Sequence, residues 1–169
     1  MAPAAVSAYA PSTTFGVQEY GGFWIRLVAT LVDRLVIGAV AVPIFVTMVL
    51  PSLIKLIHEA EMNHEPAPEL IASMVGASVF YGLIVFVGQW LYEALMTCSS
   101  WQATLGKRLL HLIVVDEQGQ RITFGRATGR FFAKILSSLI LQIGFIMVAF
   151  TDRKQGLHDL MAHTLVKRM

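Results

Sequence analysis

Residues 70–92 read LIASMVGASVFYGLIVFVGQWLY, a run of 23 residues without an Asp, Glu, Lys or Arg. A helix rises about 1.5 Å per residue and the hydrocarbon layer of a membrane is about 30 Å thick, so about 20 apolar residues span it. This run is therefore long enough to cross a membrane as one helix. Residues 35–54 and 135–151 lack charged side chains in the same way. Such clustering predicts that lipid surrounds part of the chain.

The overall composition favours the same interpretation. Hydrophobic residues make up 56% of the 169 residues and charged residues 14%, whereas a soluble domain carries about 25% charged residues. The net charge of +2 is too small to indicate nucleic-acid binding, so we expect no nucleic-acid partner. Cys98 is the single cysteine and cannot form an internal disulfide. These features argue against a soluble enzyme and against a disulfide-stabilised secreted domain.

The predicted fold class is an all-α membrane protein with two transmembrane helices, a third short transmembrane or re-entrant segment, and a small cytoplasmic β-hairpin. We place the helices at about residues 22–50, 70–96 and 125–151, and the hairpin at about residues 108–124. The uncharged part of the third helix has only 17 residues, which is marginal for a straight crossing. Gln142 and Gly144 lie at its middle, where a turn would return the chain.

The remaining segments complete the expected domain organisation. Residues 1–20 are predicted to be a flexible tail, since they lack the basic and apolar segments of a signal peptide, and residues 21–168 to form one membrane domain. In the hairpin, Leu109–Val115 would pair with Arg121–Phe124. Two strands alone are marginally stable, and Thr164–Lys167 is the other strand-like segment that would add a third.

The charges outside the apolar runs predict the orientation. The loop at residues 55–69 carries one Lys and four Glu, whereas residues 97–134 carry six Lys or Arg and two acidic residues. Short basic segments stay on the cytoplasmic side. We therefore expect an integral protein of the inner (plasma) membrane with a cytoplasmic N-terminus.

Two charged residues interrupt the first apolar segment. Arg26 and Asp33 are seven residues apart, so on one helix they share a face but lie about 10.5 Å apart along the axis. Because charges at membrane depth are costly, each needs a partner from elsewhere. The candidates are Arg130 for Asp33, and Asp152 or Asp159 for Arg26. The alternative is that Arg26 and Asp33 lie at the cytoplasmic interface as helix-end charges.

A basic stripe precedes the third apolar segment. Arg126, Arg130 and Lys134 recur every four residues, with aromatic and aliphatic residues between them. This pattern is typical of an interfacial helix that contacts anionic lipid headgroups. A cytoplasmic segment that is basic only because basic residues stay on the cytoplasmic side would show the same pattern.

Catalytic and metal-binding patterns are missing from the sequence. Thr104-Leu105-Gly106-Lys107 resembles the end of a phosphate-binding loop, but Trp101 and Arg108 stand where that motif needs Gly and Ser or Thr. His158 and His163 lack the spacing of a helical zinc pair. We therefore expect no enzyme, no cofactor and no metal site.

Three separated motifs resemble the RDD family of membrane proteins over about residues 20–168. They are Gly22-Phe23-Trp24-Ile25-Arg26-Leu27 with Asp33, Ala103-Thr104-Leu105-Gly106-Lys107-Arg108, and Phe150-Thr151-Asp152-Arg153 with Gly156-Leu157-His158-Asp159-Leu160. The family is named for an arginine and two aspartates. The resemblance implies Arg26 and Asp33 for the first two and Asp159 for the third, with Asp152 as the rival. His163 stands where the family pattern would have Gly, in a turn before the last strand.

The resemblance implies an integral membrane protein of prokaryotic type, with ion transport proposed for some members and membrane assembly or quality control for others. In cation/proton exchange, Asp33 would bind a proton and a cation alternately, and Arg26 would tune its affinity. In the alternative, the Arg/Asp network is a structural clamp in a non-transporting adaptor or assembly factor. Two or three short helices cannot enclose an aqueous path, so exchange requires a homo-oligomer or another membrane subunit. Membrane lipids are the other expected partners.

Overall fold

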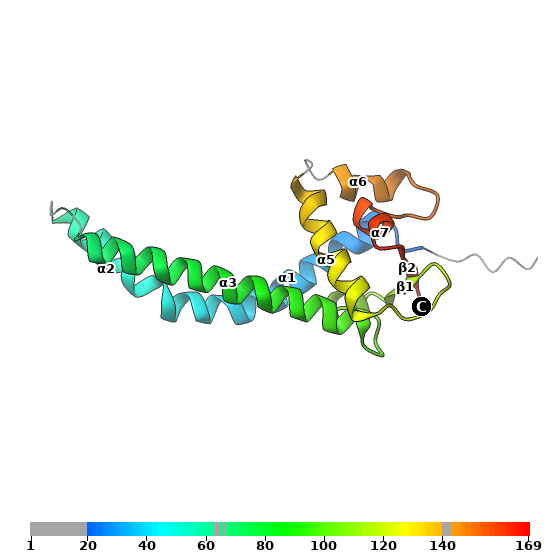
Figure 1. Cartoon of the computed structure of the whole chain (residues 1–169), viewed down its shortest axis with the longest axis horizontal. Helices are drawn as coiled ribbons and strands as arrows, with labels where there is room; N and C mark the ends of the chain where they lie inside the picture. The colour runs from blue at the N-terminus through cyan, green and yellow to red at the C-terminus, as the bar shows by residue number, and fades with distance from the viewer. Residues whose placement is uncertain (1–19, 63–64, 66, 140–142) are drawn as a thin grey trace, which may run out of the picture.

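A long helical hairpin forms one end of the molecule (Figure 1). The structure is a computed structural model that describes residues 20–62, 65, 67–139 and 143–169. Helix α1 (Phe23–Met48) is interrupted at Val49 and continues as α2 (Leu50–Glu61), and α3 (Pro68–Cys98) returns beside them. The predicted tail lies outside the described residues except for its last residue, Tyr20.

Helices α1 and α3 are the two helices, among the described residues, that are long and apolar enough to cross a membrane. Their 26 and 31 residues rise about 39 and 46 Å. Large apolar side chains on both are mostly exposed, for example Leu35 at 75% and Val79 at 58%. Hydrocarbon stabilises such a surface, whereas water does not. The two predicted apolar helices are thus confirmed.

The segment between the spanning helices is more ordered than the sequence indicated. We expected a loop from residue 55 onward, but α2 continues to Glu61. Pro51 lies in the first turn of α2, where the missing N–H of proline removes no helical hydrogen bond. Helical structure therefore continues beyond Ile54, the last residue of the first uncharged run.

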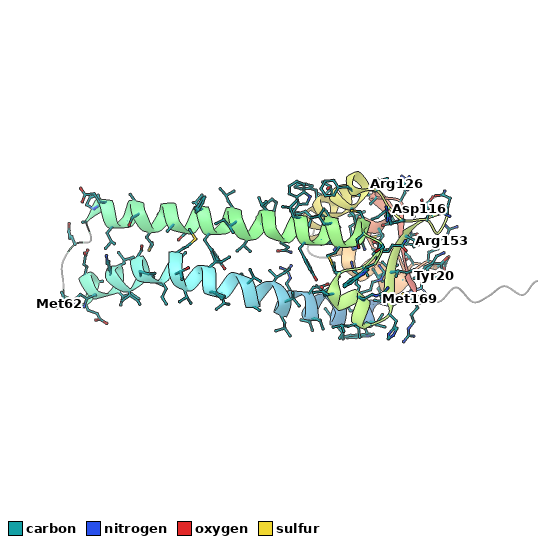
Figure 2. The ribbon with its side chains drawn as sticks, turned by 90° about the horizontal axis from the view of Figure 1, so that it is seen from below. Tyr20, Met62, Asp116, Arg126, Arg153 and Met169 are labelled. Atoms are coloured by element: carbon teal, nitrogen blue, oxygen red, sulfur yellow. The ribbon has the colours of Figure 1, made fainter. Side chains whose placement is uncertain are left out.

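The opposite end of the hairpin carries a small folded unit, which we call the cap, made of the described residues from 99 to 169. It contains α4 (Leu105–Leu109), β1 (Leu112–Asp116), α5 (Phe124–Leu139), α6 (Ile143–Phe150), α7 (Leu157–Met161) and β2 (Thr164–Arg168). Figure 2 shows Tyr20, Asp116, Arg126, Arg153 and Met169 together at the cap, far from Met62 at the tip of the hairpin.

The pairing of strands in the cap differs from the predicted hairpin. Strand β1 pairs antiparallel with β2, with Val114 opposite Val166, so the segment expected as a third strand is the main partner. The expected return strand at residues 121–124 makes one isolated bridge, between Val115 and Arg121. Its continuation is lost because the Thr123 side chain accepts a hydrogen bond from the backbone N–H of Arg126 at the start of α5.

The segment before α1 joins the same sheet. Tyr20 forms a bridge with Lys167, and the Gly21 N–H donates to the Val166 carbonyl at 2.9 Å. The beginning and the end of the described chain therefore lie side by side. This contact fixes where α1 leaves the cap.

The predicted helix over residues 125–151 is two helices. Helix α5 ends at Leu139 and α6 begins at Ile143, and Figure 1 shows them running in different directions. Gln142 lies outside the described residues. The eight residues of α6 rise about 12 Å, too short for a crossing. Helix α5 lies across the base of the hairpin because its basic residues bind there, as the next section describes.

The core of the cap is small and continues into the base of the hairpin. Its buried residues come from the sheet, from α5 and the connection before it, and from both spanning helices, and they are Ala29, Ala94, Leu112, Val114, Ile122, Ala127 and Val166. Alanines at the hairpin positions let the sheet and α5 approach α1 and α3 closely. This packing brings the charged residues of α1, α3 and α5 to one level.

Candidate functional site

Asp159 of α7 is fully buried and binds two arginines. Its Oδ2 accepts a hydrogen bond from Arg26 Nη1 at 2.5 Å, and its Oδ1 accepts from Arg130 Nη2 at 2.6 Å and Nε at 2.9 Å. The backbone N–H of Gly156 also donates to Oδ2, at 3.2 Å. One carboxylate therefore joins α1, α5 and α7. We call Arg26, Arg130 and Asp159 the clamp.

The guanidinium of Arg26 holds more than Asp159. Its Nε donates to the Gly21 carbonyl at 2.7 Å and its Nη2 donates to the Lys154 carbonyl at 2.5 Å. All three of its nitrogens are thus bound, as the planar fork of an arginine allows. Of the two aspartates considered for Arg26, the structure places Asp159 against it and leaves Asp152 exposed.

Glu93 of α3 adds a second anion to the same cluster. It accepts a hydrogen bond from Lys134 Nζ, and its Oε1 lies 3.8 Å from Arg130 Nη1. Arg130 is 2% exposed, and the Lys134 side chain is 24% exposed and bound to Glu93, so the open basic face expected for α5 is corrected. A contact of these two residues with lipid headgroups stays a prediction. Their four-residue spacing puts both on one face of α5, and buried carboxylates bind that face.

Arg126, the third residue of the basic stripe, behaves differently. Its side chain is 47% exposed and lies 3.5 Å from Asp116 Oδ2. It lies one turn before Arg130, at the outer end of α5, where a contact with lipid headgroups remains a prediction. Exposed ion pairs of this kind contribute little stability.

Asp33 has no arginine partner among the described residues, which corrects the expected pairing with Arg130. Its Oδ1 accepts hydrogen bonds from Tyr92 OH and from the Gly106 N–H, both at 2.8 Å, and its Oδ2 accepts from Thr104 Oγ1 at 2.5 Å. Arg130 binds Asp159 instead and lies 3.8 Å from Glu93. Asp33 thus holds the first turn of α4 against α1.

Gly106 makes this contact sterically feasible. A Cβ at this position would lie 2.1 Å from the Ala29 carbonyl oxygen and 3.0 Å from Asp33 Cγ. Tyr92 supports the same turn, because its hydroxyl accepts a hydrogen bond from the Leu105 N–H at 3.0 Å. The sequence motif that we excluded as a nucleotide site therefore has a structural role.

Tyr92, Thr104 and Gly106 were not predicted as site residues, and Glu93 and Lys107 were not assigned to the cluster. Glu93 had a visible signal, since it is the charge that ends the uncharged run of α3. Gly106 had a weaker one, the glycine of an incomplete phosphate-loop motif. Tyr92 and Thr104 are ordinary in their local sequence, and their role depends on the packing of α3 and α4 on α1.

Burial and charge act in opposite directions on the ionisable groups of the cap. Burial alone would raise the pKa of Asp159, but the positive charges of Arg130 and Arg26 outweigh it and hold this pKa well below its usual range. Burial lowers the pKa of His158 to about 3, despite the neighbouring Asp159 carboxylate. Burial also lowers the pKa of Lys134, against the effect of Glu93. Asp159 is therefore ionised and His158 neutral at pH 7.

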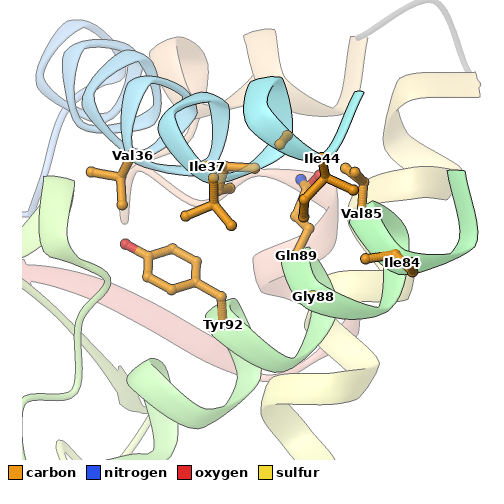
Figure 3. Close-up of a pocket in the computed structure, with 10 residues that line it drawn as sticks. Val36, Ile37, Ile44, Ile84, Val85, Gly88, Gln89 and Tyr92 are labelled. Carbon is orange, nitrogen blue, oxygen red and sulfur yellow. The ribbon is translucent and has the colours of Figure 1, made fainter. Parts of the chain in front are cut away.

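Two cavities lie beside the cluster. The larger, of about 500 Å³, is bounded by α1, α3 and α5 and contains the side chains of Asp33, Glu93, Lys107 and Arg130 in its wall. The smaller, of about 200 Å³, lies between α1 and α3 and is almost entirely apolar. Figure 3 shows Val36 and Ile37 of α1 on one side of it and Tyr92 of α3 on the other.

No group of three or more His, Cys, Asp or Glu residues in the described part of the chain is arranged to hold a metal ion. The chemistry that the site offers is ionic and hydrogen-bonding. It is built from fixed ion pairs, one hydrogen-bonded aspartate and a cavity lined by basic side chains.

Comparison with known proteins supports the resemblance noted in the sequence. The model of the RDD family matches residues 20–163, which include the clamp and Asp33. The uncharacterized protein YxaI of Bacillus subtilis strain 168 is 39% identical over 152 residues, which cover 89% of this chain and 98% of that protein. The uncharacterized membrane protein YteJ of the same organism is 32% identical over 159 residues, covering 88% of this chain and 81% of YteJ. No solved structure matches the chain significantly.

Proposed function

This chain belongs to the RDD family, and we propose that it works as a membrane adaptor in which the Arg/Asp network is a structural clamp, not as a carrier of ions and not as an enzyme. The observation that carries the proposal is the bonding of Asp159 to both Arg26 and Arg130. This carboxylate is saturated by fixed donors from three elements. Its role in the proposal is to hold the cap on the spanning hairpin.

The bonding of Asp33 also supports an adaptor. An exchanging carboxylate must release its partners to bind a proton and a cation in turn. Asp33 accepts three hydrogen bonds from Tyr92, Thr104 and Gly106, of the roughly four that a carboxylate accepts. A cation would have to displace groups that position α4. The surrounding basic side chains would repel it as well.

One observation favours exchange as the second candidate. Asp33 belongs to the spanning helix α1 and lies in the wall of the larger cavity, where an ion would need to reach it. Two spanning helices cannot enclose an aqueous path, so exchange would require further copies or another subunit. The two candidate functions predict different behaviour of the purified protein.

Flux measurements on the full chain distinguish them. The purified protein is reconstituted in liposomes that contain a pH-sensitive dye, and Na⁺ or K⁺ is added outside. We expect no cation-dependent change of internal pH. If wild type moves protons with either cation, and a folded Asp33→Asn variant does not, exchange is the function and the adaptor proposal fails.

Limited proteolysis tests the clamp directly. Asp159→Asn removes the charge that both arginines bind, so we expect the cap to be cleaved faster while the hairpin stays in the membrane. Asp152→Asn, on an exposed residue of the same motif, is the matched control and should be cleaved like wild type. Equal resistance of the Asp159→Asn and wild-type caps would contradict the clamp.

The proposed partners are membrane lipids and a second copy of the chain or another membrane subunit. Large apolar side chains of α1 and α3 remain exposed in the single chain, as Leu35 and Val79 illustrate. Lipid alone can cover them, and so can a neighbouring helix. The mass of the detergent-solubilised protein by light scattering decides between these two, since a monomeric mass excludes a stable homo-oligomer.

We also propose that the cap and the N-terminus lie in the cytoplasm and that the protein resides in the cell membrane. The support is the excess of basic residues at the cap and of acidic residues near the tip of the hairpin. Cys98 lies at the cap end of α3 and should react with an impermeant thiol reagent only after cells are opened. Met62→Cys in a Cys98→Ser background lies at the tip and should react in intact cells. The reverse pattern would overturn this orientation.

A further inference from the structure

The larger cavity has a feature that the clamp does not use. Lys107 Nζ and Arg130 Nη1 are both buried in its wall and have no hydrogen-bond partner in the described structure. Lys107 is 6% exposed and Arg130 is 2% exposed. A buried hydrogen-bond donor without an acceptor is costly, and the cost is relieved when an acceptor is bound. The cavity therefore presents two donors to whatever occupies it.

The charge of the cavity selects an anion. Basic side chains in its wall outnumber carboxylates, and the basic ones are Arg26, Arg34, Lys107, Arg130 and Lys134. The carboxylates are Asp33 and Glu93, and Asp159 lies directly behind the two clamp arginines. The carboxylates are already bound to donors of the protein. An incoming group would thus meet free N–H donors and an excess of positive charge.

The chemistry of the two donors fits a phosphate. A lysine ammonium and one arm of an arginine fork are the usual ligands of phosphate oxygens, which accept several charge-assisted hydrogen bonds at once. Burial and the charges of Arg130 and Lys134 lower the pKa of Lys107 well below its usual range. An anion beside Nζ would counteract that effect and raise the pKa of Lys107.

The position of the cavity fits an amphiphilic ligand. It lies where the apolar hairpin meets the polar cap, which is the level of lipid headgroups in a membrane. Leu27, Phe86 and Ile135 line its other walls. The smaller apolar cavity adjoins it, because Ile37, Gln89 and Tyr92 belong to the walls of both. A phosphate between Lys107 and Arg130 could thus continue into an acyl chain between α1 and α3.

We propose that the larger cavity binds a phosphate-bearing anion through Lys107 Nζ and Arg130 Nη1. The two sources of this chemistry are the headgroup of an anionic phospholipid and a free phosphate. The inference goes beyond the clamp, because the clamp uses neither of these two nitrogens. It also stands apart from ion flux, since binding is measured on the solubilised protein.

Thermal unfolding of the full chain in a neutral detergent tests the proposal. The probes are inorganic phosphate against chloride at equal ionic strength, and short-chain phosphatidylglycerol against phosphatidylcholine in the same micelles. We expect phosphatidylglycerol to raise the Tm in proportion to its concentration. A rise with phosphatidylglycerol alone assigns a lipid headgroup, and an equal rise with inorganic phosphate assigns free phosphate.

Lys107→Met is the decisive variant. It removes a buried ammonium group that makes no hydrogen bond in the described structure, so without ligand its Tm should equal or exceed that of wild type, which a lysine with a structural role would not show. Its apparent Kd for the active probe should be weaker by about tenfold or more. Lys55→Met, an exposed lysine of α2, is the control and should bind as wild type does. If Lys107→Met does not fold, Lys107→Gln takes its place with the same expectation for binding.

Three results would overturn the proposal. The first is the absence of any Tm increase with phosphatidylglycerol or with inorganic phosphate. The second is an increase of equal size in wild type and the Lys107 variant. The third is an increase with phosphatidylcholine equal to that with phosphatidylglycerol, because a net-positive cavity must prefer the anionic headgroup.

Discussion

Arg26 and Asp159 are 133 residues apart in the sequence, and their side chains meet at 2.5 Å between Nη1 and Oδ2. The contact joins the first turn of α1 to α7, close to the end of the chain. Arg130 binds the other oxygen of the same carboxylate, at 2.6 Å. A residue near each end of the domain and one in α5 thus meet at one buried point.

This contact predicts strongly coupled mutations. Asp159→Ala leaves the guanidinium groups of Arg26 and Arg130 without this carboxylate, and Arg26→Ala leaves Asp159 with Arg130 alone. Removing one partner of a buried ion pair costs about 3–5 kcal/mol of unfolding free energy. The double variant loses the pair only once, so its loss should fall short of the sum by about 1–3 kcal/mol. Chemical denaturation in a mild detergent measures all three.

The control for this cycle is the pair Arg126 and Asp116, which lies 3.5 Å apart and in which the Arg126 side chain is 47% exposed. Its coupling should be about 0–1 kcal/mol, because solvent screens it. Simple additivity of Arg26→Ala and Asp159→Ala would show that their contact does not contribute to stability. Equal coupling in both cycles would show that burial is not the cause.

Gly106→Ala should prevent normal packing of α4 on α1. The new methyl group would lie 2.1 Å from the Ala29 carbonyl oxygen, a backbone atom that cannot rotate away. Overpacking of this kind costs about 1–3 kcal/mol and occasionally more, and here it also disturbs the bond from the Gly106 N–H to Asp33. We expect a lower Tm and less folded protein after detergent extraction.

Gly129→Ala is the matched control within α5. A Cβ there meets no atom within 4 Å, so the substitution should raise the unfolding free energy by about 0.5–1 kcal/mol. If both alanines changed the Tm in the same direction by similar amounts, the close approach of α4 to α1 would not be the cause.

Features of the fold and the site that depend on local sequence were predictable, whereas contacts between distant residues were predictable only in part. The spanning helices were predictable because the absence of charge over residues 35–54 and 70–92 is a local property. The contact of Arg26 with a C-terminal aspartate was among the expected candidates, since a charge near lipid must find a counter-charge. The choice of Asp159 over Asp152 required the turn at Gly156, whose N–H donates to Asp159.

The predictions that failed depended on competition between distant partners. Arg130 was available to Asp33, Glu93 and Asp159, and sequence distance does not rank them. The strand at residues 112–116 likewise had two candidate partners, and the cap on α5 at Thr123 removed one of them. Such choices are made by tertiary packing, which acts after local propensity.

His163 offers a test of backbone strain. It adopts a φ of 50°, in the left-handed region that favours glycine, at the turn before β2. His163→Gly should raise the Tm, because relief of about 1–2 kcal/mol of strain exceeds the added unfolded-state entropy of glycine. Ala162→Gly, at a neighbouring residue with φ of −94°, adds that entropy without relieving strain and removes a buried methyl group, so it should lower the Tm. A fall in both variants would exclude strain at His163.

The buried histidine predicts a loss of stability in mild acid. Burial lowers the pKa of His158 to about 3, whereas an unfolded histidine has a pKa near 6.5. As the pH falls below 6.5, the unfolded chain binds a proton that the folded chain does not, so the folded state is penalised. Between pH 6.5 and pH 5 the loss is about 2 kcal/mol. Asp159 adds a further loss only below its unfolded pKa of 3.8, so it does not contribute in this interval.

Denaturation of wild type and His158→Gln at both pH values measures the effect, and we expect the variant to lose most of the pH dependence. His163→Gln, on an exposed ring, should keep it, and an unchanged slope in His158→Gln would show that another group titrates.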